Sequence, residues 1–148
     1  MAVALRDAQV EARLEELPVE TRTTAAAARA LGCEETEIVK SIVFVCDGRP
    51  VLALVPGDRR AAPARVAHAV EAAHARTASP DEVLAATGFA AGGVAPFPRP
   101  GFVRAVLDET ILDLVRVWIG AGTSRHMAQV AVPDLLRVAR AEPASVVE

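Results

Sequence analysis

Aromatic residues are scarce in this sequence, which has four phenylalanines, one tryptophan and no tyrosine. Proteins that stack bases on RNP-type or OB-type surfaces need several exposed aromatic side chains, so that class has little support. A basic excess is also missing, because 16 Lys and Arg against 19 Asp and Glu leave a net charge of −3. Domains that bind nucleic acid through a broad basic surface carry the opposite balance. We expect no DNA partner, and any RNA contact should be local.

Cysteine and histidine are also few. Cys33 and Cys46 form no CxxC pair, and His68, His74 and His126 do not have the spacing of zinc ligands. We therefore expect no metal and no cofactor. The chain has neither a signal-peptide pattern nor an apolar run long enough for a membrane span. It is expected to be cytoplasmic, with no membrane contact and with both thiols reduced.

Apolar residues are plentiful, at 52% of 148 residues, which is enough for one packed core. We expect residues 1–148 to form a single domain, with residues 1–17 as an N-terminal amphipathic helix. The helical pattern is clearest over residues 7–17, where Val10, Leu14 and Leu17 recur at helical spacing before Pro18.

Further helices are predicted from their end signals. One begins near Thr23 or Thr24 and ends before Gly32, and another begins at Ser79 with a capping box and ends before Gly88. Residues 61–74 and 133–140 also have helical composition. The strongest local prediction is a buried β-hairpin, because residues 38–46 are rich in β-branched side chains, Asp47-Gly48 favours a tight turn, and residues 50–55 supply the partner strand.

Three more β-like segments follow, at residues 103–107, 115–119 and 127–130. Helices and strands are mixed without regular βαβ alternation. The sequence predicts an α+β domain built on a mixed, curved sheet.

Lys40 stands out in the first strand of the predicted hairpin. Alternation places it on one face with Ile38, Ile42 and Phe44, and the opposite face is also apolar apart from Ser41. A lysine in such a place extends its amine to solvent, pairs with an acid, or lines a pocket. The residues alone leave these three interpretations open.

Two loops are further candidates. In the first, Gly92 and Gly93 precede Val94, Ala95 and Pro96, and paired glycines allow main-chain N–H groups to face a ligand oxygen. The alternative for this loop is a tight surface connection.

The second candidate loop contains Gly122, Thr123 and His126 after the strand that holds Trp118. His126 could act as an acid, a base or a phosphate ligand, or it could be an ordinary surface residue. Ser124 lacks the GxSxG setting of a hydrolase nucleophile, so a serine-hydrolase triad is not expected.

Taken in order, these segments resemble the YbaK-like proteins, which are related to the editing domain inserted in some bacterial prolyl-tRNA synthetases. The resemblance extends over roughly residues 24–140. The matching segments are residues 24–32 (TAAAARALG), 38–44 (IVKSIVF), 51–60 (VLALVPGDRR), 87–97 (TGFAAGGVAPF), 108–109 (DE) and 117–123 (VWIGAGT).

The resemblance implies a mixed, mostly antiparallel β-barrel of six to seven strands flanked by helices. It also implies aminoacyl-tRNA deacylase activity, which removes a wrong amino acid from tRNA and so supports translation fidelity. Lys40 matches the family's pocket lysine. The binding residues implied are Gly92, Gly93, Val94, Ala95, Pro96, Gly122 and Thr123, with Ser41 and His126 as further candidates.

The substrate implied is the acceptor end of tRNA(Pro) carrying Cys, Ala or another small amino acid. Association with prolyl-tRNA synthetase is a hypothesis of the same kind. Two other functions stay open at this stage. One is a non-catalytic module that binds a nucleotide or aminoacyl-tRNA, and the other is an interaction adaptor that uses the N-terminal helix.

Overall fold

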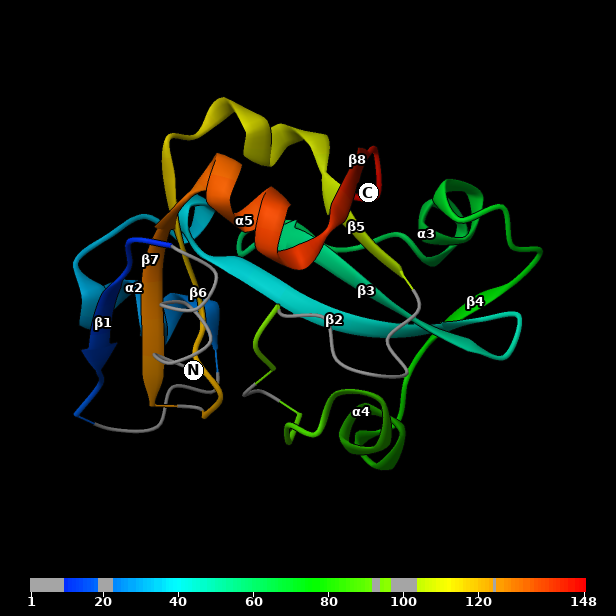
Figure 1. Ribbon diagram of the computed structural model, residues 1–148, viewed down its shortest axis with the longest axis horizontal. Helices are drawn as coiled ribbons and strands as arrows, with labels where there is room; N and C mark the ends of the chain where they lie inside the picture. The colour runs from blue at the N-terminus through cyan, green and yellow to red at the C-terminus, as the bar shows by residue number, and fades with distance from the viewer. Residues whose placement is uncertain (1–9, 19–22, 92–93, 97–103, 124) are drawn as a thin grey trace.

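The computed structural model describes residues 10–18, 23–91, 94–96, 104–123 and 125–148. Within them the chain forms two sheets, one of three strands in the order β1-β7-β6 and one of five strands in the order β4-β2-β3-β5-β8 (Figure 1). The strands are β1 (Arg13–Glu16), β2 (Val39–Cys46), β3 (Arg49–Pro56), β4 (Ala75–Thr77), β5 (Arg104–Asp108), β6 (Arg116–Gly120), β7 (His126–Ala131) and β8 (Ala141–Ala144).

The α+β class and the mixed pairing are confirmed, since β3–β5 and β5–β8 are parallel while the other pairs are antiparallel. The predicted closed barrel is not confirmed. The described part of the two sheets is joined by an isolated parallel bridge between Ile38 and Trp118 rather than by a continuous ladder. Strands β4 and β8 were not predicted.

The hairpin of β2 and β3 agrees closely with its prediction. Asp47 and Gly48 both adopt positive φ angles, 49° and 82°, which is the conformation that a two-residue turn of the I′ type requires. Register runs from Cys46 opposite Arg49 to Val39 opposite Pro56. The eight-residue strands form the central part of the larger sheet, so the position of every side chain along β2 is fixed by this pairing.

The predicted N-terminal helix is wrong where the structure describes it. Arg13–Glu16 is strand β1, paired antiparallel with β7 from Arg13 opposite Gln129 to Glu16 opposite His126. Main-chain pairing with β7 decides the conformation, and Leu14 is left exposed. The three apolar residues that suggested a helix therefore do not form one buried stripe. Residues 1–9 lie outside the described part.

The helices are α2 (Thr24–Leu31), α3 (Pro63–Ala69), α4 (Pro80–Thr87) and α5 (Val132–Ala139), with 3₁₀ turns η1 (Glu35–Glu37) and η2 (Glu109–Asp113). The ends predicted for α2 are confirmed: Thr23 caps its N-terminus, and Gly32 ends it in the left-handed region. The helix predicted over residues 61–74 is shorter than expected, because Glu71 takes a positive φ of 57° and the chain then enters β4. None of the helices in the described ranges combines the length and apolar character of a membrane span.

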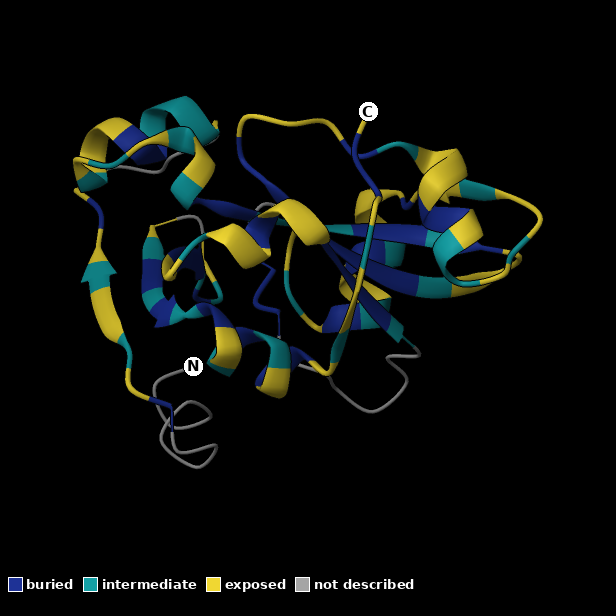
Figure 2. Cartoon of the chain, turned by 90° about the horizontal axis from the view of Figure 1, so that it is seen from above, coloured by how far each residue is buried: buried dark blue, intermediate teal, exposed yellow. Residues whose placement is uncertain are grey.

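The buried residues, dark blue in Figure 2, form three apolar clusters within the described part of the chain. The largest lies between the two sheets and α5, and includes Leu54 and Ile119. The second lies between the hairpin and α3 and includes Phe44 and Cys46, which is buried as predicted. The third joins α2 to β6 and β7 through Ile38 and Trp118.

Helix α4 is fixed to β4 by an ion pair. Glu82 closes the predicted capping box with Ser79, and both of its oxygens accept from Arg76, at 2.7 and 2.8 Å. These bonds lower the pKa of Glu82 from its ordinary 4.5 to about 2, with the Arg76 side chain as the largest cause. A lowered pKa in the folded state contributes stability above pH 4.5 that is lost as the pH falls toward 2.

We therefore expect Glu82→Gln to lower the melting temperature at neutral pH, and the difference from the parent protein to shrink steadily below about pH 4.5. Thermal melts between pH 2 and 7 measure this. Asp81→Asn is the control, because it removes a carboxylate from the same first turn of α4. Equal melting temperatures for the Gln variant and the parent at neutral pH would show that the pair contributes nothing.

Candidate functional site

Lys40 lies between two of the apolar clusters. It is on the same face of β2 as Ile38, which packs with Trp118, and as Ile42 and Phe44, which pack in the cluster against α3. Its register partner on β3 is Val55, which is fully buried in the second cluster. The side chain itself is half-buried. An aliphatic setting on both sides is therefore confirmed for this lysine.

The Lys40 amine donates a hydrogen bond of 2.6 Å to the main-chain carbonyl of Arg59, in the loop after β3. Burial is the main cause that lowers the pKa of Lys40, and Arg60 lowers it further, while Asp58 and Glu35 raise it. No side-chain ion pair of Lys40 is found among the described residues, so of the three interpretations the ion pair has no support.

The loop that holds the Arg59 carbonyl begins at a glycine in close contact with its surroundings. A Cβ on Gly57 would lie 2.1 Å from Cγ2 of Thr24 and 2.6 Å from the carbonyl oxygen of Glu35. The Gly57 N–H also donates to the carbonyl of Ile38 at 2.7 Å. The β3–α3 loop, the start of α2 and the start of β2 therefore meet here, two residues from Lys40.

Strand β6 brings a second glycine to the same side of the structure. The bridge between Ile38 and Trp118 is parallel, so Lys40 and Gly120 each lie two residues beyond it. Because side chains alternate along a strand, Lys40 faces the same side as Ile38, and a Cβ on Gly120 would face the same side as Trp118. That Cβ would be 2.7 Å from the carbonyl oxygen of Val94. The main chain at Val94 therefore lies against β6 at Gly120, and the Val94 side chain packs in the largest cluster with Val39 and Val43 of β2.

Val94, Ala95 and Pro96 are buried, and they are the described end of the predicted glycine loop. Gly92 and Gly93, together with Ser124, lie outside the described residues. Ser41 points to the opposite face of β2 from Lys40, and its Oγ is buried with no hydrogen-bond partner in the described structure. The structure thus places Val94 against β6 and Ser41 on the face of β2 opposite Lys40.

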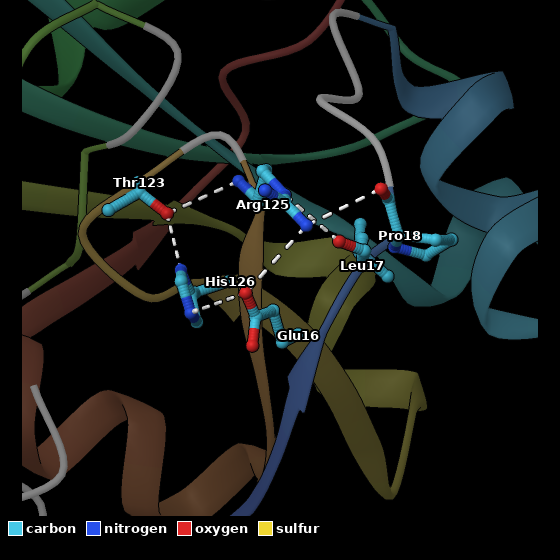
Figure 3. Close-up of polar contacts among 6 residues, drawn as sticks. All are labelled: Glu16, Leu17, Pro18, Thr123, Arg125 and His126. Carbon is cyan, nitrogen blue, oxygen red and sulfur yellow. Dashed lines mark hydrogen bonds and ion pairs between the residues drawn. The ribbon is translucent and has the colours of Figure 1, made fainter.

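The predicted turn after β6 is held by a small polar network (Figure 3). Thr123 Oγ1 and His126 Nδ1 share a hydrogen bond of 2.6 Å, and Thr123 Oγ1 also accepts from the Arg125 N–H at 3.2 Å. Gly122 needs its positive φ of 99°, and its position packs against the ring of Phe89. Thr123 is an exposed residue.

Glu16 is a member of this network that the sequence did not indicate. Its carboxylate lies 3.9 Å from His126 Nε2 and 3.7 Å from an Arg125 nitrogen. Arg125 also donates to the carbonyls of Leu17 and Pro18, at 3.1 and 3.4 Å. These contacts depend on the pairing of β1 with β7. The sequence analysis predicted a helix for residues 1–17, so it did not indicate this pairing.

The site around Lys40 is distinct from an open groove of about 310 Å³ between the hairpin end and α4. Val43 and Val45 line this groove from β2, and Ala85 and Ala86 line it from α4. Its carboxylate, Glu82, is already engaged by Arg76, so the groove offers no reactive group. Within the described ranges, no cluster of three or more His, Cys, Asp or Glu side chains could hold a metal ion.

The aminoacyl-tRNA editing domain model matches residues 19–138, and the chain belongs to that family. Among curated proteins it is similar to proline–tRNA ligase of Lactobacillus johnsonii, with 36% identity over 99 residues, which are 67% of this chain and 18% of the ligase. Proline–tRNA ligase of Acidithiobacillus ferrooxidans is 28% identical over 127 residues, covering 79% of this chain and 22% of the ligase. The chain thus spans about a fifth of the length of these relatives.

Two crystal structures are similar over nearly the whole chain. One is described as a candidate trans-editing enzyme for prolyl-tRNA synthetase, with a TM-score of 0.88, 36% identity, and coverage of 99% of this chain and 93% of that one. The other is a hypothetical protein with a TM-score of 0.91, 28% identity, and coverage of 99% and 98%. The predicted family is therefore confirmed.

Proposed function

We propose that this protein is an aminoacyl-tRNA deacylase that acts in trans on mischarged tRNA. The proposed substrate is tRNA(Pro) carrying Cys, Ala or another small amino acid. The observation that carries the proposal is the half-buried Lys40 amine, which lies between two apolar clusters and donates to the Arg59 carbonyl at 2.6 Å. Membership of the editing family supports it, as does similarity to the candidate trans-editing enzyme.

Ester hydrolysis needs a water molecule, stabilisation of the oxyanion and help for the departing ribose oxygen. The Lys40 amine has three N–H donors, and one of them is used by the Arg59 carbonyl. The remaining two can face the ester or the terminal ribose. Their effect is larger beside aliphatic side chains than in water, because a less polar setting strengthens charge interactions.

The remaining binding groups are proposed to come from two segments. Val94, Ala95 and Pro96, with the preceding Gly92 and Gly93, would receive the aminoacyl-adenosine end through main-chain groups, and Gly122 and Thr123 would line the same pocket. No protein nucleophile is required. Groups of the substrate, such as a ribose hydroxyl, would supply part of the proton transfer.

Selection of the amino acid is proposed to depend on pocket volume, because one methylene is worth about 1–3 kcal/mol in an apolar site. An acidic chain with a net charge of −3 is suited to a contact limited to the acceptor end of the tRNA. Extra affinity could come from prolyl-tRNA synthetase as a partner.

A deacylation panel tests the proposal. tRNA(Pro) charged with Pro, Ala or Cys, together with cognate Ala-tRNA and Cys-tRNA, is incubated with catalytic amounts of protein, and release of amino acid is followed. We expect multiple turnovers on Ala-tRNA(Pro) or Cys-tRNA(Pro), with Pro-tRNA(Pro) spared. Binding without turnover at stoichiometric protein would instead identify a non-catalytic binding module. No release and no binding would overturn both functions.

A further inference from the structure

The segment whose carbonyl accepts from the Lys40 amine is itself hydrogen-bonded to the last residues of the sequence. The Arg59 guanidinium donates to the carbonyl oxygen of Glu148 at 2.5 Å, and the Glu148 N–H donates to the Arg60 carbonyl at 2.9 Å. Ala61 and Val147 form an antiparallel bridge next to these two bonds, and the Ala62 N–H donates to the Val146 carbonyl at 2.8 Å. The Arg59 side chain and the main chain that follows the Arg59 carbonyl are therefore tied to residues 146–148.

Residues 146–148 are anchored in turn by a buried carboxylate. The Val146 N–H donates to Asp108 Oδ1 at 3.1 Å, and Asp108 is 1% exposed. The other Asp108 oxygen accepts from the Thr110 N–H and hydroxyl. Val146 and Val147 are buried in the same cluster as Val55, the register partner of Lys40. The anchor is therefore part of the core and not a loose surface contact.

We propose that residues 146–148 are a positioning element for Lys40, which fix the Arg59 carbonyl and through it the direction of the amine. These residues lie beyond the span 19–138 that matches the editing family. The proposal rests on the proposed function only for its effect on catalysis, because the hydrogen-bond path from Asp108 to Lys40 can be tested without substrate.

The amine needs such an element because its own side chain is flexible. A lysine side chain has four rotatable bonds, and a misplacement of about 1 Å in a catalytic group can cost about 100-fold in rate. The described neighbours along β2 are aliphatic and offer the amine no hydrogen bond. The Arg59 carbonyl at 2.6 Å is the polar contact that selects one direction for it.

Two matched pairs of variants test this. Glu148→Pro removes the N–H that the Arg60 carbonyl accepts, while Glu148→Ala keeps it and removes the same side chain. Arg59→Met removes the guanidinium that bonds to Glu148 but leaves the Arg59 carbonyl in the chain, and Arg49→Met removes an arginine at the far end of β3. All four are assayed where circular dichroism shows them fully folded.

We expect Glu148→Pro and Arg59→Met to lower kcat about tenfold with little change in KM, and the two controls to match the parent protein. The second readout needs no substrate: the Lys40 amine is titrated by NMR. Because burial is the main cause that lowers the pKa of Lys40, loosening the loop admits water and raises this pKa in the two test variants.

The two readouts separate the failure of this proposal from the failure of the proposed function. If the parent protein deacylates but both test variants keep its kcat and its Lys40 titration, residues 146–148 do not position the amine. Loss of thermal stability alone, with both readouts unchanged, overturns the proposal equally. If the parent protein has no deacylase activity but the titration moves as expected, the proposed function fails and the positioning element stands.

Discussion

Replacing Lys40 with methionine is expected to slow deacylation about 100-fold, the usual loss when one preorganised charge-stabilising donor is removed. Methionine keeps the apolar stem of the lysine as far as Cε, so contacts with the two flanking clusters should survive. The variant loses the amine and its bond to the Arg59 carbonyl. Single-turnover release of alanine or cysteine from tRNA(Pro) measures the rate, and thermal melting measures the fold.

Lys40→Arg is the matched control, since it keeps a positive charge but presents a planar group in place of a compact amine. We expect it to recover part of the activity at most. A methionine variant that turns over at the parental rate would remove Lys40 from the mechanism. If the rate falls only together with a clear fall in melting temperature, the role of Lys40 is structural.

Gly57→Ala is expected to produce the largest loss of stability among single-methyl additions at the described glycines. The new Cβ would meet Thr24 Cγ2 at 2.1 Å and the Glu35 carbonyl at 2.6 Å, and the second contact is with main chain that cannot turn away. Overpacking of this kind costs about 1–3 kcal/mol, and we expect the upper end of that range. Urea unfolding measures the change in the free energy of unfolding.

Gly48→Ala is the comparison for this prediction. Gly48 has a positive φ of 82° but nothing within 4 Å of its Cβ position, so alanine there meets backbone strain without a clash. Gly57 has the clash without the positive φ. A larger loss at Gly57 than at Gly48 is the expected order. The reverse order would show that the β3–α3 loop moves away from α2 at little cost.

Local signals in the sequence were sufficient for much of the fold. The turn at Asp47-Gly48, the caps at Thr23 and Ser79, and the glycine after α4 each depend on residues only a few positions apart. Lys40 was found in the same way, because alternation along one strand already places a charge among aliphatic side chains. For these features the chain neighbours determine the environment.

The errors concern contacts between distant segments. Residues 13–16 form a strand because β7 pairs with them, and Leu17 and Arg125, 108 residues apart, are joined by hydrogen bonds. Strand β8 similarly depends on β5. A short amphipathic pattern contains no information on such a partner, so the helical spacing of three apolar residues was misleading.

The candidate site shows the same division. Gly57 and Gly120 matter for what lies against them, namely Thr24 and the Val94 carbonyl, and neither contact can be predicted from the glycine's own neighbours. Asp108 was noted in the sequence only as part of a segment that matches the family, and its burial and its bond to the Val146 N–H were not predicted. Three-dimensional packing assigns these roles.

The pairing of β1 with β7 also has a consequence for biosynthesis. The first described strand finds its partner only at Gln129 and its neighbours, so the three-stranded sheet cannot form until β7 (His126–Ala131) has been synthesised. Until then the exposed edges of β1 and the apolar side of Trp118 have no cover from β7. Contacts so distant in sequence slow folding, and the nascent polypeptide passes through a stage in which β1 is complete but has no partner strand.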